Sequence, residues 1–236
     1  MNGILYGVGV GTGDPEMMTL KAVRIIRSAD VICLPKIPKE ECRAYRIALQ
    51  AIPEIAEKEV LSFDFEMTCD KNVLKAKHQE IYHAVKEQLQ KGKTLAFLTI
   101  GDPTVYSTFC YLAKLAGAGG LPVRFISGVT AFLASAAGCG ISLCEGNEDL
   151  HIFSGQKGIG DIGEKLLLPG TKVILKCGKR ADEIKDRLSK LEQENNVEIY
   201  TVQECGADME QIIHGADSIP TDGKYMTTII VKETVI

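Results

Sequence analysis

The sequence lacks the cysteine spacing of a metal site and the long apolar run of a membrane span. None of its eight cysteines forms a Cys-x-x-Cys pair, and its four histidines lie apart from them, so a zinc or iron–sulfur site built on local spacing is not expected. No apolar run approaches the ~18–20 residues that cross a bilayer, so we expect no membrane partner. The start of the sequence has no signal-peptide pattern, and we expect reduced thiols in a cytoplasmic protein.

An excess of basic residues is also missing. Lys and Arg number 27 and Asp and Glu 31, which gives a formal net charge of −4. Nucleic-acid binding depends on clustered basic side chains, so we expect no nucleic-acid partner. Hydrophobic residues make up 45% of the chain, the ordinary balance of a protein that buries a core. A length of 236 residues accommodates one large domain or two small ones.

The first half of the chain alternates short apolar segments with helical patterns. Helical spacing of apolar residues predicts helices over 19–29 and 72–90. The apolar segments are continuous rather than alternating, which is typical of parallel strands buried on both faces. We predict strands at residues 3–10, 31–34, 59–63, 94–99 and 123–126. This pattern indicates an α/β domain built on an open parallel sheet.

The second half has looser alternation and longer loops. It predicts one clear helix, residues 181–194, and strands at residues 151–154, 172–177, 197–203 and 226–232. We therefore predict a second α/β domain with a mixed sheet. We place the two domains at residues 1–128 and 129–236, with the boundary within 117–143.

A glycine-rich stretch follows the first predicted strand. Four alternating glycines lead to Asp14-Pro15, where Asp favours a helix N-cap and Pro fits a first helical turn. The stretch does not fit Gly-x-Gly-x-x-Gly, because the third glycine is replaced by Thr12, Asp14 or Glu16 in each frame. The stretch is therefore not a dinucleotide fingerprint. It is either a tight turn or a loop that binds a different ligand.

Two more loops repeat the arrangement of a strand followed by glycine. Gly101-Asp102-Pro103 follows the strand predicted at 94–99, and Gly128 and Thr130 follow the strand predicted at 123–126. Loops at the carboxyl ends of parallel strands form the binding crevice of such sheets. No Lys or Arg lies within the three loops, and Asp14 and Asp102 add negative charge, which disfavours a polyphosphate. A ligand with a cationic and a hydroxyl-rich part, such as S-adenosylmethionine, fits better; helix capping alone is the alternative for both aspartates.

The motifs at residues 9–22, 99–106 and 126–131 together resemble those of the tetrapyrrole methylases, which use S-adenosylmethionine. Segments 5–11, 30–36 and 151–156 are most similar to members that methylate carbon 20 of precorrin-2 or cobalt-factor II in cobalamin synthesis. The resemblance implies two α/β domains with the active site in the trough between them, usually in a homodimer. Uroporphyrinogen-III and precorrin-4 methylases, diphthine synthase and a non-catalytic cofactor-binding protein are the alternatives.

The resemblance also implies the site residues. In the second domain Cys177 takes the place of the family's methionine, and residues 225–228 resemble the segment that closes over the adenine. Thr12 and Ser127 stand where many relatives have proline. The implied cofactor residues are Gly11, Thr12, Ile100, Gly101, Asp102, Val105, Tyr106, Thr130, Ala131, Cys177, Met226 and Thr227.

A polyanionic tetrapyrrole requires local positive charge in this acidic chain. A basic cluster follows the strand predicted at 31–34, although solvated surface charge is the alternative. We expect the substrate-binding residues to be Asp14, Lys36, Lys39, Arg43 and Arg46. The sequence identifies no catalytic base and implies no metal.

Overall fold

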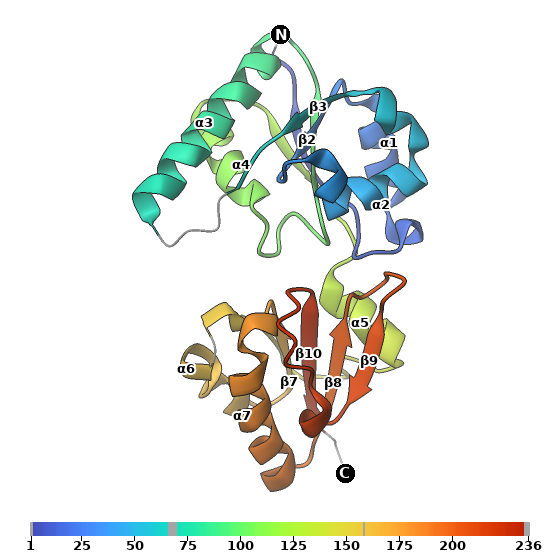
Figure 1. The fold of residues 1–236 in the computed structure, drawn as a ribbon, viewed down its shortest axis with the longest axis vertical. Coiled ribbons are helices and arrows are strands. Elements are labelled where there is room, and N and C mark those ends of the chain that lie inside the picture. The colour runs from blue at the N-terminus through green and yellow to red at the C-terminus, as the bar shows by residue number, and fades with distance from the viewer. Residues whose placement is uncertain (1, 66–69, 158, 234–236) are drawn as a thin grey trace. The chain divides into compact units, whose positions relative to one another are not determined.

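The computed structural model describes residues 2–65, 70–157 and 159–233. The chain forms two compact units, Met1–Thr130 and Ala131–Ile236 (Figure 1). The sequence predicted a division after residue 128. Within the described residues each unit contains one five-stranded sheet.

The sheet of the first unit is parallel throughout, with the strand order β3-β2-β4-β1-β5. Strand β1 lies between two strands that come much later in the sequence, and Leu5 pairs with both Leu95 and Val123. This confirms the predicted open parallel sheet. The strands are β1 (Leu5–Gly9), β2 (Val31–Leu34), β3 (Glu59–Ser62), β4 (Leu95–Thr99) and β5 (Val123–Ile126).

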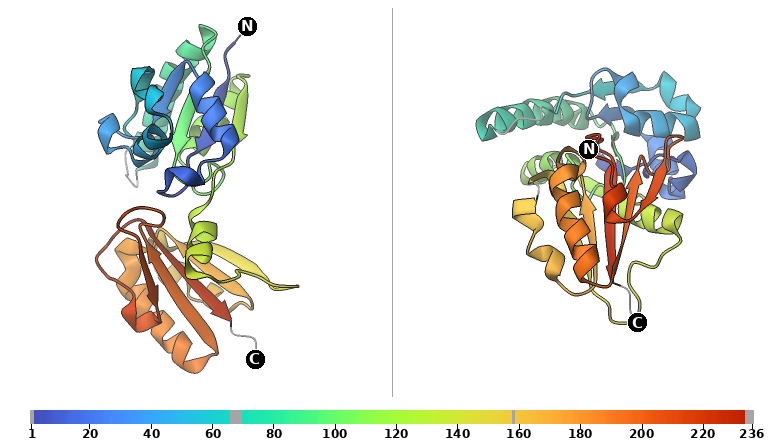
Figure 2. Two further views of the ribbon diagram at one scale, coloured as in Figure 1. Left: turned by 90° about the vertical axis from the view of Figure 1, so that its right-hand side faces the viewer. Right: turned by 60° about the horizontal axis from the view of Figure 1, so that its bottom comes forward.

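Helices cover both faces of this sheet (Figure 2). Alternate strand residues point to opposite faces. Val8 and Leu98 therefore belong to the core on the side of α1 and α2, whereas Leu5 and Phe97 belong to the core on the side of α3 and α4. The apolar runs in these strands are continuous because each face of the sheet packs against its own hydrophobic core. The helices are α1 (Leu20–Ser28), α2 (Arg43–Ala51), α3 (Lys71–Gln90) and α4 (Phe109–Ala118).

Helix α2 was not predicted from the sequence. Its N-cap, Cys42, makes no side-chain capping hydrogen bond, so the usual start signal is missing. Its buried residues are Ala44, Tyr45, Ile47 and Ala48. Ile47 is the one large aliphatic side chain among them, so the helical spacing of apolar residues is hard to recognise in the sequence. Two residues of the predicted basic cluster therefore lie on a helix rather than in a loop.

The second unit has a mixed sheet, with the order β6-β7-β10-β8-β9, which confirms the prediction. Strand β7 is parallel to β6 and antiparallel to β10, and β8 is antiparallel to both of its neighbours. The strands are β6 (Leu150–Ser154), β7 (Thr171–Leu175), β8 (Val197–Gln203), β9 (Gln211–His214) and β10 (Thr227–Glu233). The helices are α5 (Ala131–Cys139), α6 (Ile159–Ile162) and α7 (Ala181–Glu194).

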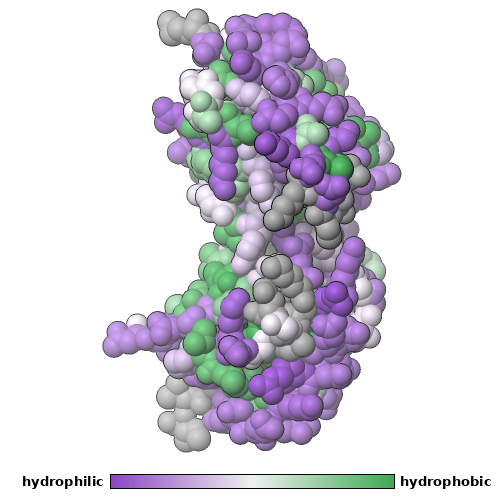
Figure 3. All heavy atoms as spheres, turned by 90° about the vertical axis from the view of Figure 1, so that its left-hand side faces the viewer, coloured by the Kyte–Doolittle hydropathy of each residue, from purple (hydrophilic) through white to green (hydrophobic). Residues whose placement is uncertain are grey.

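Helix α7 closes the core on one face of this sheet. Ile184 and Leu188 pack there with strand residues such as Ile199 and Ile229. Hydrophilic residues cover much of the face drawn in Figure 3, as expected when apolar side chains are concentrated in such cores. In the part of the chain that the structure describes, no helix combines the length and apolar character needed to cross a membrane.

Candidate functional site

The chain leaves two neighbouring strands of the first sheet in opposite directions. After β1 it runs to α1 on one face, and after β4 it runs to α4 on the other. Such a point in an open parallel sheet leaves a crevice at the carboxyl ends of the two strands, where ligands bind. The two loops with Gly-Asp-Pro begin at this point, so the topology and the sequence motifs indicate the same place.

The three predicted loops contact one another there. The Gly101 amide donates a hydrogen bond to the Gly11 carbonyl oxygen at 2.7 Å, which joins the loops after β1 and β4. The Gly101 carbonyl oxygen lies so close to Gly9 and Gly128 that a Cβ at either position would overlap it. Glycine at positions 9 and 128 is therefore required for the close approach of the three loops.

Two features of this cluster favour a bound ligand. Gly101 is buried and has φ of +68°, a conformation that favours glycine, and because it has no side chain of its own a ligand atom can approach its backbone closely. The buried Oγ1 atom of Thr130 has no hydrogen-bond partner within the described residues. A buried hydroxyl without a partner is costly, and a polar ligand atom would satisfy it.

The Asp102 carboxylate holds the loops together. Only 8% of the residue is exposed. Its Oδ1 accepts hydrogen bonds from the Thr104 amide at 2.8 Å and the Thr104 hydroxyl at 2.5 Å, and its Oδ2 accepts one from the Gly128 amide at 3.1 Å. The side chain thus joins the loop after β4 to the loop after β5, a role that the sequence motif did not reveal.

Neither aspartate caps an α-helix, although helix α1 lies within the predicted residues 19–29. Asp14 accepts a hydrogen bond from the Glu16 amide at 2.7 Å and caps a short 3-10 turn, Pro15–Met17. Helix α1 begins later, because the Thr19 hydroxyl accepts from the Ala22 amide and supplies its N-cap. After β4, Pro103 lies in a loop, and α4 begins only at Phe109.

The remaining predicted residues of the first unit surround this cluster. Thr12 is buried, and its hydroxyl donates to the Met17 sulfur at 3.3 Å. Ile100 packs against the core beside α1 and α2. Val105 is half-buried, and its amide donates to the Asp102 carbonyl oxygen.

Tyr106 stands out because its backbone is strained. It has φ of +48°, a conformation that a bulky residue rarely adopts, and 46% of the residue is exposed. Strained backbone is concentrated at binding and catalytic sites. An exposed aromatic ring held in this way is suited to contact with a flat ligand. Ala131, the neighbour of Thr130, is the first residue of α5 and belongs to the second unit.

The basic cluster lies at the same edge of the sheet. It follows the carboxyl end of β2, and β2 is the neighbour of β4. Lys36 forms an ion pair with Glu41 at 3.5 Å, and the Lys39 ammonium lies 5.6 Å from the centre of the Tyr45 ring. Arg43 and Arg46 lie on α2. Exposed ion pairs of this kind are weak, so Lys36 is readily available to an anionic ligand.

The predicted residues of the second unit also share one sheet edge. The carboxyl ends of β6, β7 and β8 and the amino end of β10 all lie there, because β10 is antiparallel to β7 and β8. Cys177 follows β7 and is fully buried, with its sulfur 3.5 Å from the Thr227 carbonyl oxygen. Burial raises the pKa of Cys177 to about 12, so the thiol is neutral and is not a nucleophile at neutral pH.

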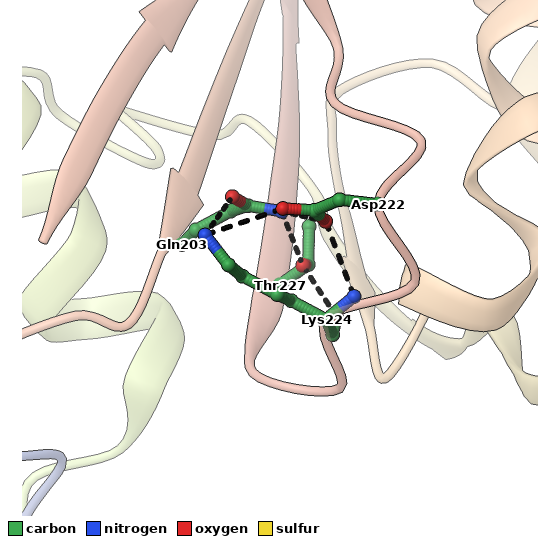
Figure 4. A network of polar contacts seen from close by, with 4 residues as sticks. All are labelled: Gln203, Asp222, Lys224 and Thr227. Carbon is green, nitrogen blue, oxygen red and sulfur yellow. Dashed lines mark hydrogen bonds and ion pairs between the residues drawn. The ribbon is translucent and has the colours of Figure 1, made fainter. Parts of the chain in front are cut away.

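A polar network at this edge was not found from the sequence. It joins Gln203 at the end of β8 to Asp222, Lys224 and Thr227 (Figure 4). Thr227 is buried, whereas Met226 is half-buried and accepts a hydrogen bond from the Glu204 amide at 2.9 Å. The only sequence signal is a glutamine at the end of an apolar strand, which is equally typical of a solvated strand end.

Among the residues that the structure describes, no three His, Cys, Asp or Glu side chains are grouped so that they could hold a metal ion. The groups that converge in the first unit are backbone amides and carbonyls, a hydroxyl and a carboxylate. Such a set suits an organic ligand with hydroxyl and cationic groups better than a phosphate.

The sequence matches known proteins over nearly its whole length. The chain is 33% identical over 232 residues to a probable cobalt-precorrin-2 C(20)-methyltransferase of Methanocaldococcus jannaschii, which covers 97% of this chain and 95% of the relative. It is 28% identical to a precorrin-2 C(20)-methyltransferase of a Sinorhizobium species, again over 97% and 95% of the two chains.

Solved structures with the same fold include a cobalt precorrin-4 methyltransferase, with a TM-score of 0.74 at 17% identity over 97% of this chain and 94% of that one. Another is a uroporphyrin-III C-methyltransferase from Thermus thermophilus in complex with S-adenosylhomocysteine, with a TM-score of 0.71 at 23% identity over 98% of each chain. Residues 4–216 match the tetrapyrrole (corrin/porphyrin) methylases as a sequence family. The chain therefore belongs to the tetrapyrrole methylase family.

Proposed function

We propose that this protein is an S-adenosylmethionine-dependent methyltransferase that methylates carbon 20 of precorrin-2, or of its cobalt-containing form, in cobalamin biosynthesis. The observation that carries the proposal is the similarity to two C(20)-methyltransferases over 97% of the chain. The site is consistent with this activity, since it offers the cofactor the backbone of a glycine with positive φ and a buried hydroxyl without a partner among the described residues, with no basic side chain in the three loops.

When bound, the cofactor would supply a sulfonium methyl group: an electron-rich ring carbon would attack the methyl carbon in line, S-adenosylhomocysteine would leave, and the ring carbon would then lose a proton. The protein therefore needs to orient two ligands and exclude water, more than to supply reactive groups. Gly101 and Thr130 would hold the cofactor through the backbone and the Oγ1 hydroxyl. Asp102 would keep the three loops in place, and its negative charge would favour a cationic ligand near the crevice. Cys177 would contribute packing, because its thiol is neutral and buried.

Mass spectrometry of the products tests the proposal. The purified protein is incubated with S-adenosylmethionine and one tetrapyrrole in each of three separate reactions. The tetrapyrroles are precorrin-2, cobalt-factor II and uroporphyrinogen-III. We expect one added methyl group on the first or the second of these, and fragmentation should place it at carbon 20. Methylation of uroporphyrinogen-III alone would assign the chain to a different reaction of the family. Cofactor binding without methylation of any tetrapyrrole would indicate a non-catalytic binding protein.

On the substrate side, we propose that the basic cluster at Lys36, Lys39, Arg43 and Arg46 holds the carboxylates of the tetrapyrrole. Reversing two charges, Lys36→Glu with Arg43→Glu, should raise the KM for the tetrapyrrole by about tenfold at low salt and leave the affinity for S-adenosylhomocysteine unchanged. Salt should reduce the difference, because exposed charges are screened. Steady-state kinetics at two ionic strengths measures the effect.

A matched control applies the same charge change on the opposite face of the sheet, with Lys91→Glu at the C-cap of α3 and Lys114→Glu in α4. The control should leave the KM near the value of the unaltered protein. Equal increases in the two double variants would show that overall charge, rather than this cluster, attracts the substrate.

We also propose that the chain acts in the cytoplasm as a homodimer, which the family resemblance supports. Sedimentation velocity tests the oligomer directly. A species of twice the chain mass at micromolar concentration agrees with the proposal, and a monomer at all concentrations contradicts it.

A further inference from the structure

Gln203 occupies the centre of the polar network at the edge of the second sheet. The residue is fully buried. Its Nε2 group donates hydrogen bonds to Asp222 Oδ1 at 3.0 Å and to Thr227 Oγ1 at 3.2 Å, and its Oε1 accepts one from Lys224 Nζ at 3.5 Å (Figure 4). One side chain therefore holds three residues of the segment that leads into β10.

Each partner of Gln203 is itself fixed. The Thr227 hydroxyl donates to the Lys224 carbonyl oxygen at 2.7 Å, so it is free to accept only, and the Gln203 amide is the donor it requires. The Asp222 carboxylate forms an ion pair with the Lys224 ammonium at 3.2 Å. The hydrogen bond from Gln203, with help from Lys224, holds the pKa of Asp222 below its usual value. The segment 222–227 is thus closed into a turn around the glutamine amide.

This turn contacts the loop after β7. Gly178 lies directly against the Lys224 carbonyl oxygen, so close that a Cβ would overlap it, and the Cys177 sulfur contacts the Thr227 carbonyl oxygen. The two contacting segments carry Cys177, Met226 and Thr227, three of the cofactor residues that the family resemblance implies in the second unit. A shift of segment 222–227 would therefore move Met226 and Thr227 and also change the packing of Cys177 in the loop after β7.

We infer that Gln203 is a positioning residue for the cofactor: it touches no ligand, but it fixes segment 222–227 against the loop after β7 and so sets cofactor affinity. The inference rests on the proposed function. A neutral amide is required, because it alone donates to Asp222 and Thr227 while accepting from Lys224. A carboxylate at position 203 would face the Asp222 carboxylate, and an apolar side chain would leave the buried Thr227 hydroxyl without its donor.

The Gln203→Met variant keeps the size of the side chain and removes the hydrogen bonds. We expect its Kd for S-adenosylhomocysteine, measured by calorimetry, to rise about tenfold, the effect of losing one or two hydrogen bonds. The KM for S-adenosylmethionine should rise in parallel, whereas the KM for the tetrapyrrole and kcat at saturation should change little. The matched control is Gln88→Met in α3, where a glutamine Oε1 atom is buried without a partner among the described residues.

A rescue experiment separates positioning from a general loss of stability. Gln203→Glu should weaken binding at least as much as Gln203→Met, and addition of Asp222→Asn should recover part of the affinity by restoring a donor–acceptor pair between positions 203 and 222. An unchanged Kd in Gln203→Met, with or without a lower melting temperature, would overturn the inference and leave the proposed function intact. Absence of binding by the unaltered chain would instead overturn the proposed function.

Discussion

The Gly9→Ala variant is expected to lose about 3 kcal/mol of its free energy of unfolding and nearly all affinity for S-adenosylhomocysteine. A Cβ at this position would overlap the Gly101 carbonyl oxygen and lie 2.7 Å from the Gly128 backbone nitrogen. Both neighbours are backbone atoms, so no rotamer change relieves the overlap, and the loops after β4 and β5 must move apart. Urea denaturation and calorimetry measure the two effects.

The matched control is Gly117→Ala in α4, where nothing lies within 4 Å of the added Cβ. Alanine is favoured over glycine in a helix by up to ~1 kcal/mol, so this variant should be slightly more stable and bind normally. If Gly9→Ala bound S-adenosylhomocysteine as tightly as the unaltered protein, the contact between the three loops would not shape the cofactor site.

The Asp102→Ala variant is expected to bind S-adenosylhomocysteine more weakly by about 1–3 kcal/mol, or roughly 5- to 150-fold. The substitution leaves the Thr104 and Gly128 amides without their acceptor and releases the loop after β5, which carries Thr130. Calorimetry on folded protein measures the loss. Asp102→Asn keeps an acceptor for Thr104 but places an amide group near the Gly128 amide. Its affinity for S-adenosylhomocysteine should therefore lie between that of the unaltered protein and that of Asp102→Ala.

Asp30→Ala is the control for this prediction. Asp30 accepts a hydrogen bond from the Thr94 amide at 2.7 Å, at the amino ends of β2 and β4, the opposite edge of the same sheet. Its loss should lower stability and leave affinity unchanged. Equal losses of affinity in the two variants would mean that Asp102 acts through the stability of the unit rather than through the loops.

Strong local patterns made much of the fold predictable. Strand β8 and helix α7 have the predicted limits, because a run of β-branched and aromatic residues marks the strand and Ile184, Leu188 and Leu191 recur at helical spacing. Strand β9 was not predicted. It has four residues, lies at the edge of its sheet and is largely exposed, so it has no apolar run to mark it.

The site was less predictable than the fold. The glycine loops could be located because glycine itself marks close backbone approach, and the topology now places them at the point where the chain diverges. The partners of Asp102 and Gln203 could not be read from the sequence. Hydrogen bonds to Gly128, 26 positions away, or to Asp222, 19 positions away, depend on how distant segments meet. No local pattern records that.

The strand order of the first sheet also determines when the site can form during synthesis. Strand β1 is synthesised first, but its two neighbours in the sheet are β4 and β5. Leu5 can therefore pair only after Leu95 and Val123 have been synthesised. Until then β1 has no partner along either edge, and pairings over such sequence separations form slowly. A nascent chain that ends before β4 therefore presents an apolar strand with unpaired backbone groups, the kind of segment that aggregates or is held by chaperones.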